Sequence, residues 1–130
     1  VRHSNARDIA QVSLEQIIVW NPEVIFVGRQ YSTDLVLRDP RWRQVRAVRN
    51  GRVYGIPDGV FYWDSSSEGV LLLLYLAKTL HPERFADIDL HQEVRDYYRR
   101  FYGYALSEAE ATLLLRGLNP QGQRRNPLGN

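Results

Sequence analysis

Residues 28–32 contain two side chains that could hold a small ligand, Arg29 and Tyr31. A guanidinium can grip a carboxylate, a catecholate or an oxyanion through two parallel hydrogen bonds. A phenol oxygen can donate a hydrogen bond or serve as a hard ligand to ferric iron. This stretch therefore predicts a contact with an anionic group or an iron complex.

A second candidate stretch, residues 58–66, carries three aromatic side chains in succession, followed by serines. Phe61 and Trp63 could stack on a flat ligand, and the phenol of Tyr62 adds a polar group. Ser65 precedes a predicted helix, whose first free N–H groups favour anions. We therefore predict ligand contacts from these four residues as well.

Each candidate also has a structural explanation that the sequence leaves open. The aromatic run could form a lid over the buried helix that follows it, and Arg29 could be a surface charge. Ser65 and its neighbours could simply cap that helix, because serine is a favoured N-cap residue.

Other kinds of site have little support in the sequence. Cysteine is absent, which excludes disulfides, thiolate catalysis and Cys-ligated zinc. The three histidines (His3, His81 and His91) are scattered, so we predict no metal site. Neither a G-x-S-x-G elbow nor a phosphate-binding glycine motif occurs. Asp58 or Asp64 could act as an acid or base, but neither has a visible catalytic partner, so we predict no catalytic residues and no enzyme.

Composition is that of an ordinary globular chain of one domain or one lobe. The 130 residues are 44% hydrophobic and 25% charged, with a formal net charge of +2. This charge is too small to require a nucleic acid, even though arginines recur between residues 38 and 52, because acidic residues are interspersed among them. The first residues lack the apolar region of an export signal.

The elements that position the candidate residues alternate between helix and strand before ending in helices. Residues 24–27 form a continuous β-branched and aromatic run, which is typical of a strand buried on both faces. A second strand is predicted at 53–56, and residues 119–130 have the composition of a disordered tail. Capping boxes, apolar periodicity and breakers predict helices at 14–20, 34–37, about 42–48, 67–80, 90–102 and 108–117.

This order predicts an α/β fold with parallel strands. Ligands of such sheets bind outside the carboxyl ends of the strands, where both candidate stretches lie. The helix at 67–80 is apolar nearly all round and should be buried between layers. Two strands make a weak sheet, so we expect further strands upstream or from another copy.

Four blocks carry a family resemblance through their order and spacing. They are residues 12–27, residues 39–54, residues 63–85 and residues 98–107. Together they resemble the C-terminal lobe of periplasmic substrate-binding proteins of ABC importers for iron-siderophore, haem and cobalamin. The resemblance covers residues 12–117. It implies a Rossmann-like, three-layer α/β lobe with a short parallel sheet flanked by helices and a helical C-terminal part.

The resemblance implies that residues 1–118 form the second of two lobes, with ligand held in the cleft between them. The N-terminal lobe and the export signal would be missing from this chain. The whole protein would be periplasmic or extracellular, compatible with a lipoprotein anchor, and would deliver its ligand to a membrane permease. The protein would need no cofactor of its own, since any iron or cobalt would belong to the ligand.

In this family an exposed glutamate on each lobe is thought to dock on permease arginines, and Glu68 is the candidate here. The alternative is that Glu68 only complements the dipole of the helix that it precedes. A second function also stays open, a small α/β interaction domain that self-associates through an exposed sheet edge.

Overall fold

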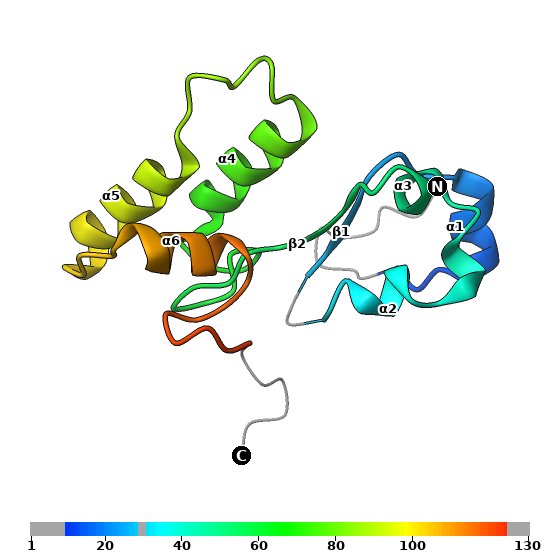
Figure 1. Cartoon of the computed structure of the whole chain (residues 1–130), viewed down its shortest axis with the longest axis horizontal. Helices are drawn as coiled ribbons and strands as arrows, with labels where there is room; N and C mark the ends of the chain where they lie inside the picture. Colours follow the sequence, from blue (N-terminus) through cyan, green and yellow to red (C-terminus); the bar gives the residue numbers. More distant parts are fainter. Residues whose placement is uncertain (1–9, 29–30, 125–130) are drawn as a thin grey trace. The chain divides into compact units, whose positions relative to one another are not determined.

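The computed structural model describes residues 10–28 and 31–124 (Figure 1). The described residues divide into two compact units, one comprising residues 10–25 and 34–53 and the other residues 26–28, 31–33 and 54–124. Within the described part of the chain, no helix is long and apolar enough to cross a membrane.

The first unit is a set of short helices held by local caps. Ser13 accepts a hydrogen bond from the backbone of Gln16 at 3.2 Å, which is the N-cap half of the predicted capping box. Asn21 ends the first helix in the left-handed conformation (φ 46°). Buried Val36, Val45 and Ala47 form its core. The elements are α1 (Leu14–Trp20), α2 (Asp34–Leu37), the 3-10 helix η1 (Pro40–Trp42) and α3 (Arg46–Arg49).

The described residues contain one sheet, of two strands, β1 (Ile25–Val27) and β2 (Val53–Gly55). The backbone N–H of Ile25 donates to Arg52 O at 3.0 Å, and that of Ile56 donates to Val27 O at 2.8 Å. These bonds come alternately from the two strands, which is the parallel pattern. The predicted α/β fold with a short parallel sheet and a helical C-terminal part is thus confirmed.

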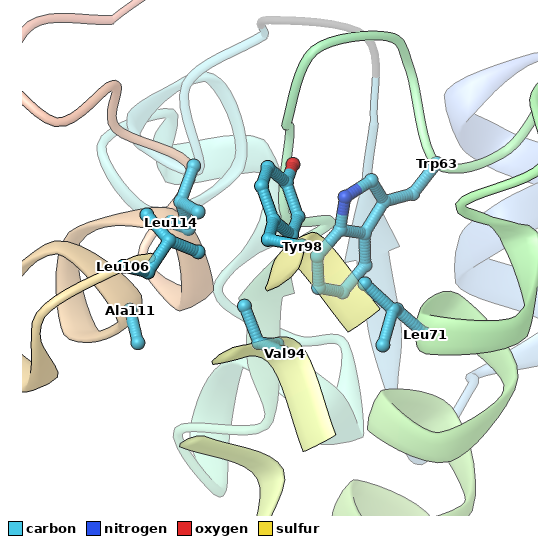
Figure 2. Close-up of a cluster of buried hydrophobic side chains, with 7 residues drawn as sticks. All are labelled: Trp63, Leu71, Val94, Tyr98, Leu106, Ala111 and Leu114. Atoms are coloured by element: carbon cyan, nitrogen blue, oxygen red, sulfur yellow. The ribbon is translucent and has the colours of Figure 1, made fainter. Parts of the chain in front are cut away.

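The second unit contains the main core, formed around three helices (Figure 2). Asp89 caps the second of these, which ends at Gly103 in the left-handed conformation (φ 65°). Ser107 and Glu110 form the predicted capping box of the third. The helices are α4 (Gly69–Leu80), α5 (Leu90–Tyr102) and α6 (Glu108–Leu115), and the buried core residues are Trp63, Leu71, Val94, Tyr98, Leu106, Ala111 and Leu114.

Two details of α4 differ from the prediction. Among its apolar residues only Leu71 is fully buried, whereas Val70 and Leu73 are 49% and 66% exposed. A two-stranded sheet offers too little apolar surface to bury a helix on all sides. No serine occupies the N-cap position of α4, because Glu68 lies there with a helical backbone and makes no side-chain capping bond. Ser66 Oγ accepts a hydrogen bond from Glu68 N at 3.2 Å, in the turn before the helix.

The region after α6 is ordered by one asparagine. Oδ1 of Asn119 accepts hydrogen bonds from the backbone N–H groups of Gln121 and Gln123, at 3.0 and 2.8 Å. Residues 119–123 therefore form a closed turn, where the composition predicted disorder.

Candidate ligand-binding site

A small pocket of about 100 Å³ lies in the second unit, beside the residues that follow β1 and β2. It occupies the position where parallel α/β sheets bind ligands, beyond the carboxyl ends of the strands. Three segments of the chain meet there. Its lining residues are Tyr31, Thr33, Gly55, Ile56, Asp58, Arg116, Gly117 and Arg124.

Aromatic contacts fix the end of β2 at this pocket. The hydroxyl of Tyr75, on α4, donates a 3.0 Å hydrogen bond to the carbonyl of Gly55. The ring of Phe26 stacks on Tyr54 with centroids 5.7 Å apart and meets Tyr75 edge-on at 6.3 Å. Burial raises the pKa of Tyr75, so its hydroxyl stays protonated and can keep donating.

A glycine turn at the end of α6 brings an arginine to the same place. Gly117 has a left-handed backbone (φ 71°), and a Cβ at this position would lie 3.6 Å from the carbonyl oxygen of Ile56. The N–H of Leu118 returns to Leu113 O at 2.9 Å, closing the turn. Arg116 thereby lines the pocket next to the residues that follow β2.

The pocket combines positive charge with a phenol. Arg116 and Arg124 are both exposed, and Tyr31 is 62% exposed, so their polar groups can reach a ligand. Asp58 gives the lining a negative charge as well, so a ligand would be selected by the placement of its charges. Among residues 10–28 and 31–124, no group of three His, Cys, Asp or Glu side chains could hold a metal ion.

The predicted site residues do not all come together. Tyr31 lines the pocket, whereas Arg29 lies outside the described residues. Phe61, 58% exposed, Tyr62, half-buried, and Ser65, exposed, lie outside the pocket's lining.

Trp63 departs from the prediction that it stacks on a ligand. Its side chain is only 1% exposed and lies in the core with Leu71 and Tyr98 (Figure 2). The indole is the largest fully buried side chain of the described residues. In this structure Trp63 is a core residue. Its large apolar surface makes burial in the core more favourable than exposure to solvent.

The turn at residues 58–62 is hydrogen-bonded to the buried carboxylate of Glu68. Asp58 and Tyr62 form an isolated antiparallel bridge, and the N–H of Gly59 donates to Phe61 O at 3.1 Å. Oε1 of Glu68 accepts a hydrogen bond from Val60 N at 3.2 Å, and Oε2 accepts one from Phe61 N at 3.0 Å.

Glu68 also accepts a hydrogen bond from Tyr98 and is 0% exposed. A carboxylate with no exposed surface and three donors around it cannot present itself to a permease. The prediction that Glu68 is exposed, on which its docking role depends, is therefore wrong for this structure. Its partner Tyr98 lies about thirty residues away in sequence, so no local pattern could have revealed this burial.

Sequence reasoning missed Arg116 and Arg124 as site residues. Arg116 directly precedes Gly117, where the last predicted helix ends, and a glycine there is a recognisable helix end. Arg124 lies in the stretch predicted to be a disordered tail, where no local signal places it at a pocket.

Comparison with known proteins identifies the relatives of this chain. The family model described as periplasmic binding protein matches residues 3–60. The chain is also 35% identical over 114 residues to the molybdate-binding protein MolA of Haemophilus influenzae, a match that covers 78% of this chain and 32% of MolA. Over these spans the chain is similar to periplasmic binding proteins.

Solved periplasmic binding proteins share the fold. The solute-binding protein of Veillonella parvula has a TM-score of 0.74 at 26% identity, over 82% of this chain and 34% of its own. MolA bound to molybdate has a TM-score of 0.64 at 34% identity, over 75% and 31%. CeuE of Helicobacter pylori, in a Ni-His complex, has a TM-score of 0.65 at 30% identity, over 79% and 34%.

The chain spans about a third of the length of these periplasmic binding proteins. The relatives that it matches are binding proteins, in agreement with the prediction that the chain is not an enzyme.

Proposed function

We propose that this chain is the second lobe of a two-lobed solute-binding protein that captures a small anion or an anionic metal complex for an ABC importer. Similarity to periplasmic binding proteins supports a periplasmic location and a membrane permease as partner. The chain's length, about a third of that of its relatives, supports one lobe of a larger protein. The ligand class includes oxyanions and ferric siderophores that carry carboxylate or catecholate groups.

The observation that carries the proposal is the pocket that Tyr31, Arg116 and Arg124 line together. Guanidinium groups bind oxyanions and carboxylates through paired, charge-assisted hydrogen bonds. A volume of about 100 Å³ suits one tetrahedral oxyanion, or one anionic group of a larger ligand. MolA, named for molybdate, is a relative whose ligand has this chemistry.

Titration calorimetry of the full-length protein tests this function. The ligands would be molybdate, a ferric catecholate siderophore, haem and cobalamin, which separates a free oxyanion from an anionic complex. Arg116→Gln should weaken binding of the active ligand about 10- to 100-fold, because it removes a charge-assisted bond of roughly 1.5–3 kcal/mol.

The matched control is Arg84→Gln, an exposed arginine outside the pocket, which should leave affinity unchanged. Equal affinity of Arg116→Gln and the unmodified protein would remove Arg116 from the site. Failure of all four ligands to bind would overturn the proposed ligand class.

The two-stranded sheet favours the second candidate function, an interaction domain. Unpaired backbone groups at sheet edges promote pairing with another chain. Among the described residues no third strand covers either edge. Concentration-dependent sedimentation of the 130-residue chain would support self-association, and a monomer at high concentration would oppose it.

A further inference from the structure

Glu68 is a buried carboxylate whose hydrogen-bond donors include two adjacent backbone amides of one turn. Burying a charged group is costly unless it is fully hydrogen-bonded. Here the required donors are Val60 N, Phe61 N and the hydroxyl of Tyr98. The turn is therefore part of the environment that stabilises the charge, and the charge in return stabilises the turn.

Tyr98 completes this arrangement from α5. Its hydroxyl donates to Oε1 of Glu68 at 2.6 Å and accepts a second bond from Val60 N at 3.2 Å. The N–H of Val60 thus points between two oxygen acceptors. Loss of either side chain leaves the other with a donor or acceptor unsatisfied.

Gly59 allows the backbone to come this close. A Cβ at Gly59 would lie 2.7 and 2.8 Å from the two carboxylate oxygens of Glu68, and it would also clash with the hydroxyl of Tyr98. The position requires glycine because of this close approach.

The turn connects this buried pair to the candidate site. Asp58, at the start of the turn, lines the pocket, and the exposed side chains of Val60 and Phe61 lie at its tip. The bridge between Asp58 and Tyr62 closes the turn, so holding its amides also holds Asp58.

We infer that Glu68 and Tyr98 are positioning residues that hold the 58–62 turn in its ligand-competent conformation. This inference rests on the proposed function, because it treats the turn as part of the ligand site. Neither side chain needs to touch the ligand. Both would act by reducing the number of conformations that the turn samples before binding.

Hydrogen exchange of the full-length protein, without ligand, provides the first test. Glu68→Gln keeps the shape of the side chain but replaces one acceptor oxygen with an NH₂ group facing an N–H donor. We expect amide exchange in residues 59–62 to accelerate at least about tenfold, while exchange within α5 and α6 stays unchanged. Tyr98→Phe should give a smaller acceleration, because Glu68 remains. This variant also tests the inference if Glu68→Gln does not fold.

Molybdate titration of the same variants provides the second test. Faster exchange should accompany weaker molybdate binding, by about threefold or more. The matched control is Glu93→Gln, an exposed glutamate on α5 that should change neither quantity. If the unmodified protein does not bind molybdate, the ferric siderophore, haem and cobalamin replace it in turn.

The outcomes separate the two proposals. Unchanged exchange in both folded variants would overturn the inference, whether or not any ligand binds. Accelerated exchange with unchanged affinity would also overturn it, because the turn would then be irrelevant to binding. Accelerated exchange in a protein that binds none of the four ligands would contradict the proposed function while leaving the turn-holding role of Glu68 in place.

Discussion

The hydroxyl of Tyr98 lies 2.6 Å from Oε1 of Glu68, joining residues that are 30 positions apart. Burial, and then the hydrogen bond to Glu68, raise the pKa of Tyr98 well above its ordinary value. The hydroxyl therefore keeps its proton and remains a donor to the carboxylate. This contact links α5 to the turn that precedes α4.

Alkaline pH should destabilise the protein partly through Tyr98. A raised pKa in the folded state gives stability that is fully present below the ordinary value of 10.0. This stability is lost as pH rises above that value, because the unfolded chain releases the proton first. Urea unfolding between pH 9 and pH 11 should show a shallower loss of stability for Tyr98→Phe. An equally steep loss in both proteins would contradict the assignment.

Gly59→Ala should destabilise the fold by roughly 1–3 kcal/mol, because its methyl group would overlap Glu68 and Tyr98. Thermal and urea unfolding measure this loss. Gly55→Ala is the matched control, since its nearest neighbour would be Thr33 Cγ2 at 4.0 Å. Similar stability of the two variants would mean that the close approach at Gly59 relaxes easily.

Phe61 and Trp63 should contribute very differently to stability. Trp63→Ala removes a core side chain that is 1% exposed and should cost about 3–5 kcal/mol in unfolding free energy. Phe61→Ala removes a side chain that is 58% exposed and should change stability by less than about 0.5 kcal/mol. Urea unfolding of both variants provides the comparison. A large stability loss for Phe61→Ala would indicate that this ring packs on the protein.

The capping box of α6 should make stability sensitive to acid. Hydrogen bonds from the backbone and then the side chain of Ser107 hold the pKa of Glu110 below its ordinary value of 4.5. The stabilisation is therefore present above pH 4.5 and is lost as pH falls through the lowered pKa.

Thermal unfolding between pH 7 and pH 3 tests this dependence, which Glu110→Gln should reduce. Ser107→Ala should lower stability by about 1 kcal/mol at pH 7 through loss of the cap. If Glu110→Gln loses stability between pH 7 and pH 3 as steeply as the unmodified protein, other carboxylates cause the acid dependence.

Local signals account for most of the correctly predicted fold. Ser13 and Ser107 each precede a Gln or Glu by three residues, and both are N-caps of helices as predicted. Gly103 ends α5 in the left-handed conformation that glycine adopts most readily. Both predicted strands form, because β-branched runs bounded by glycine or proline are specific over a few residues.

The site was harder to predict because it depends on long-range contacts. Glu68 follows three serines, a pattern typical of an exposed helix start, yet its partner lies on α5. Trp63 belongs to a run of three aromatics, and sequence alone does not distinguish which of them points into the core. Arg116 reaches the pocket only because the turn at Gly117 lies against the chain after β2.

Lys78 is the sole lysine of the chain, and its ammonium group is engaged. It donates hydrogen bonds to the carbonyls of Phe85 and Ile88, in the connection between α4 and α5. Acylation of Lys78 requires its nitrogen to leave these two carbonyls, so the reaction rate depends on how often the hydrogen bonds open. The rate at which an amine-reactive reagent labels Lys78 Nζ would therefore report how often the connection between α4 and α5 detaches from α4.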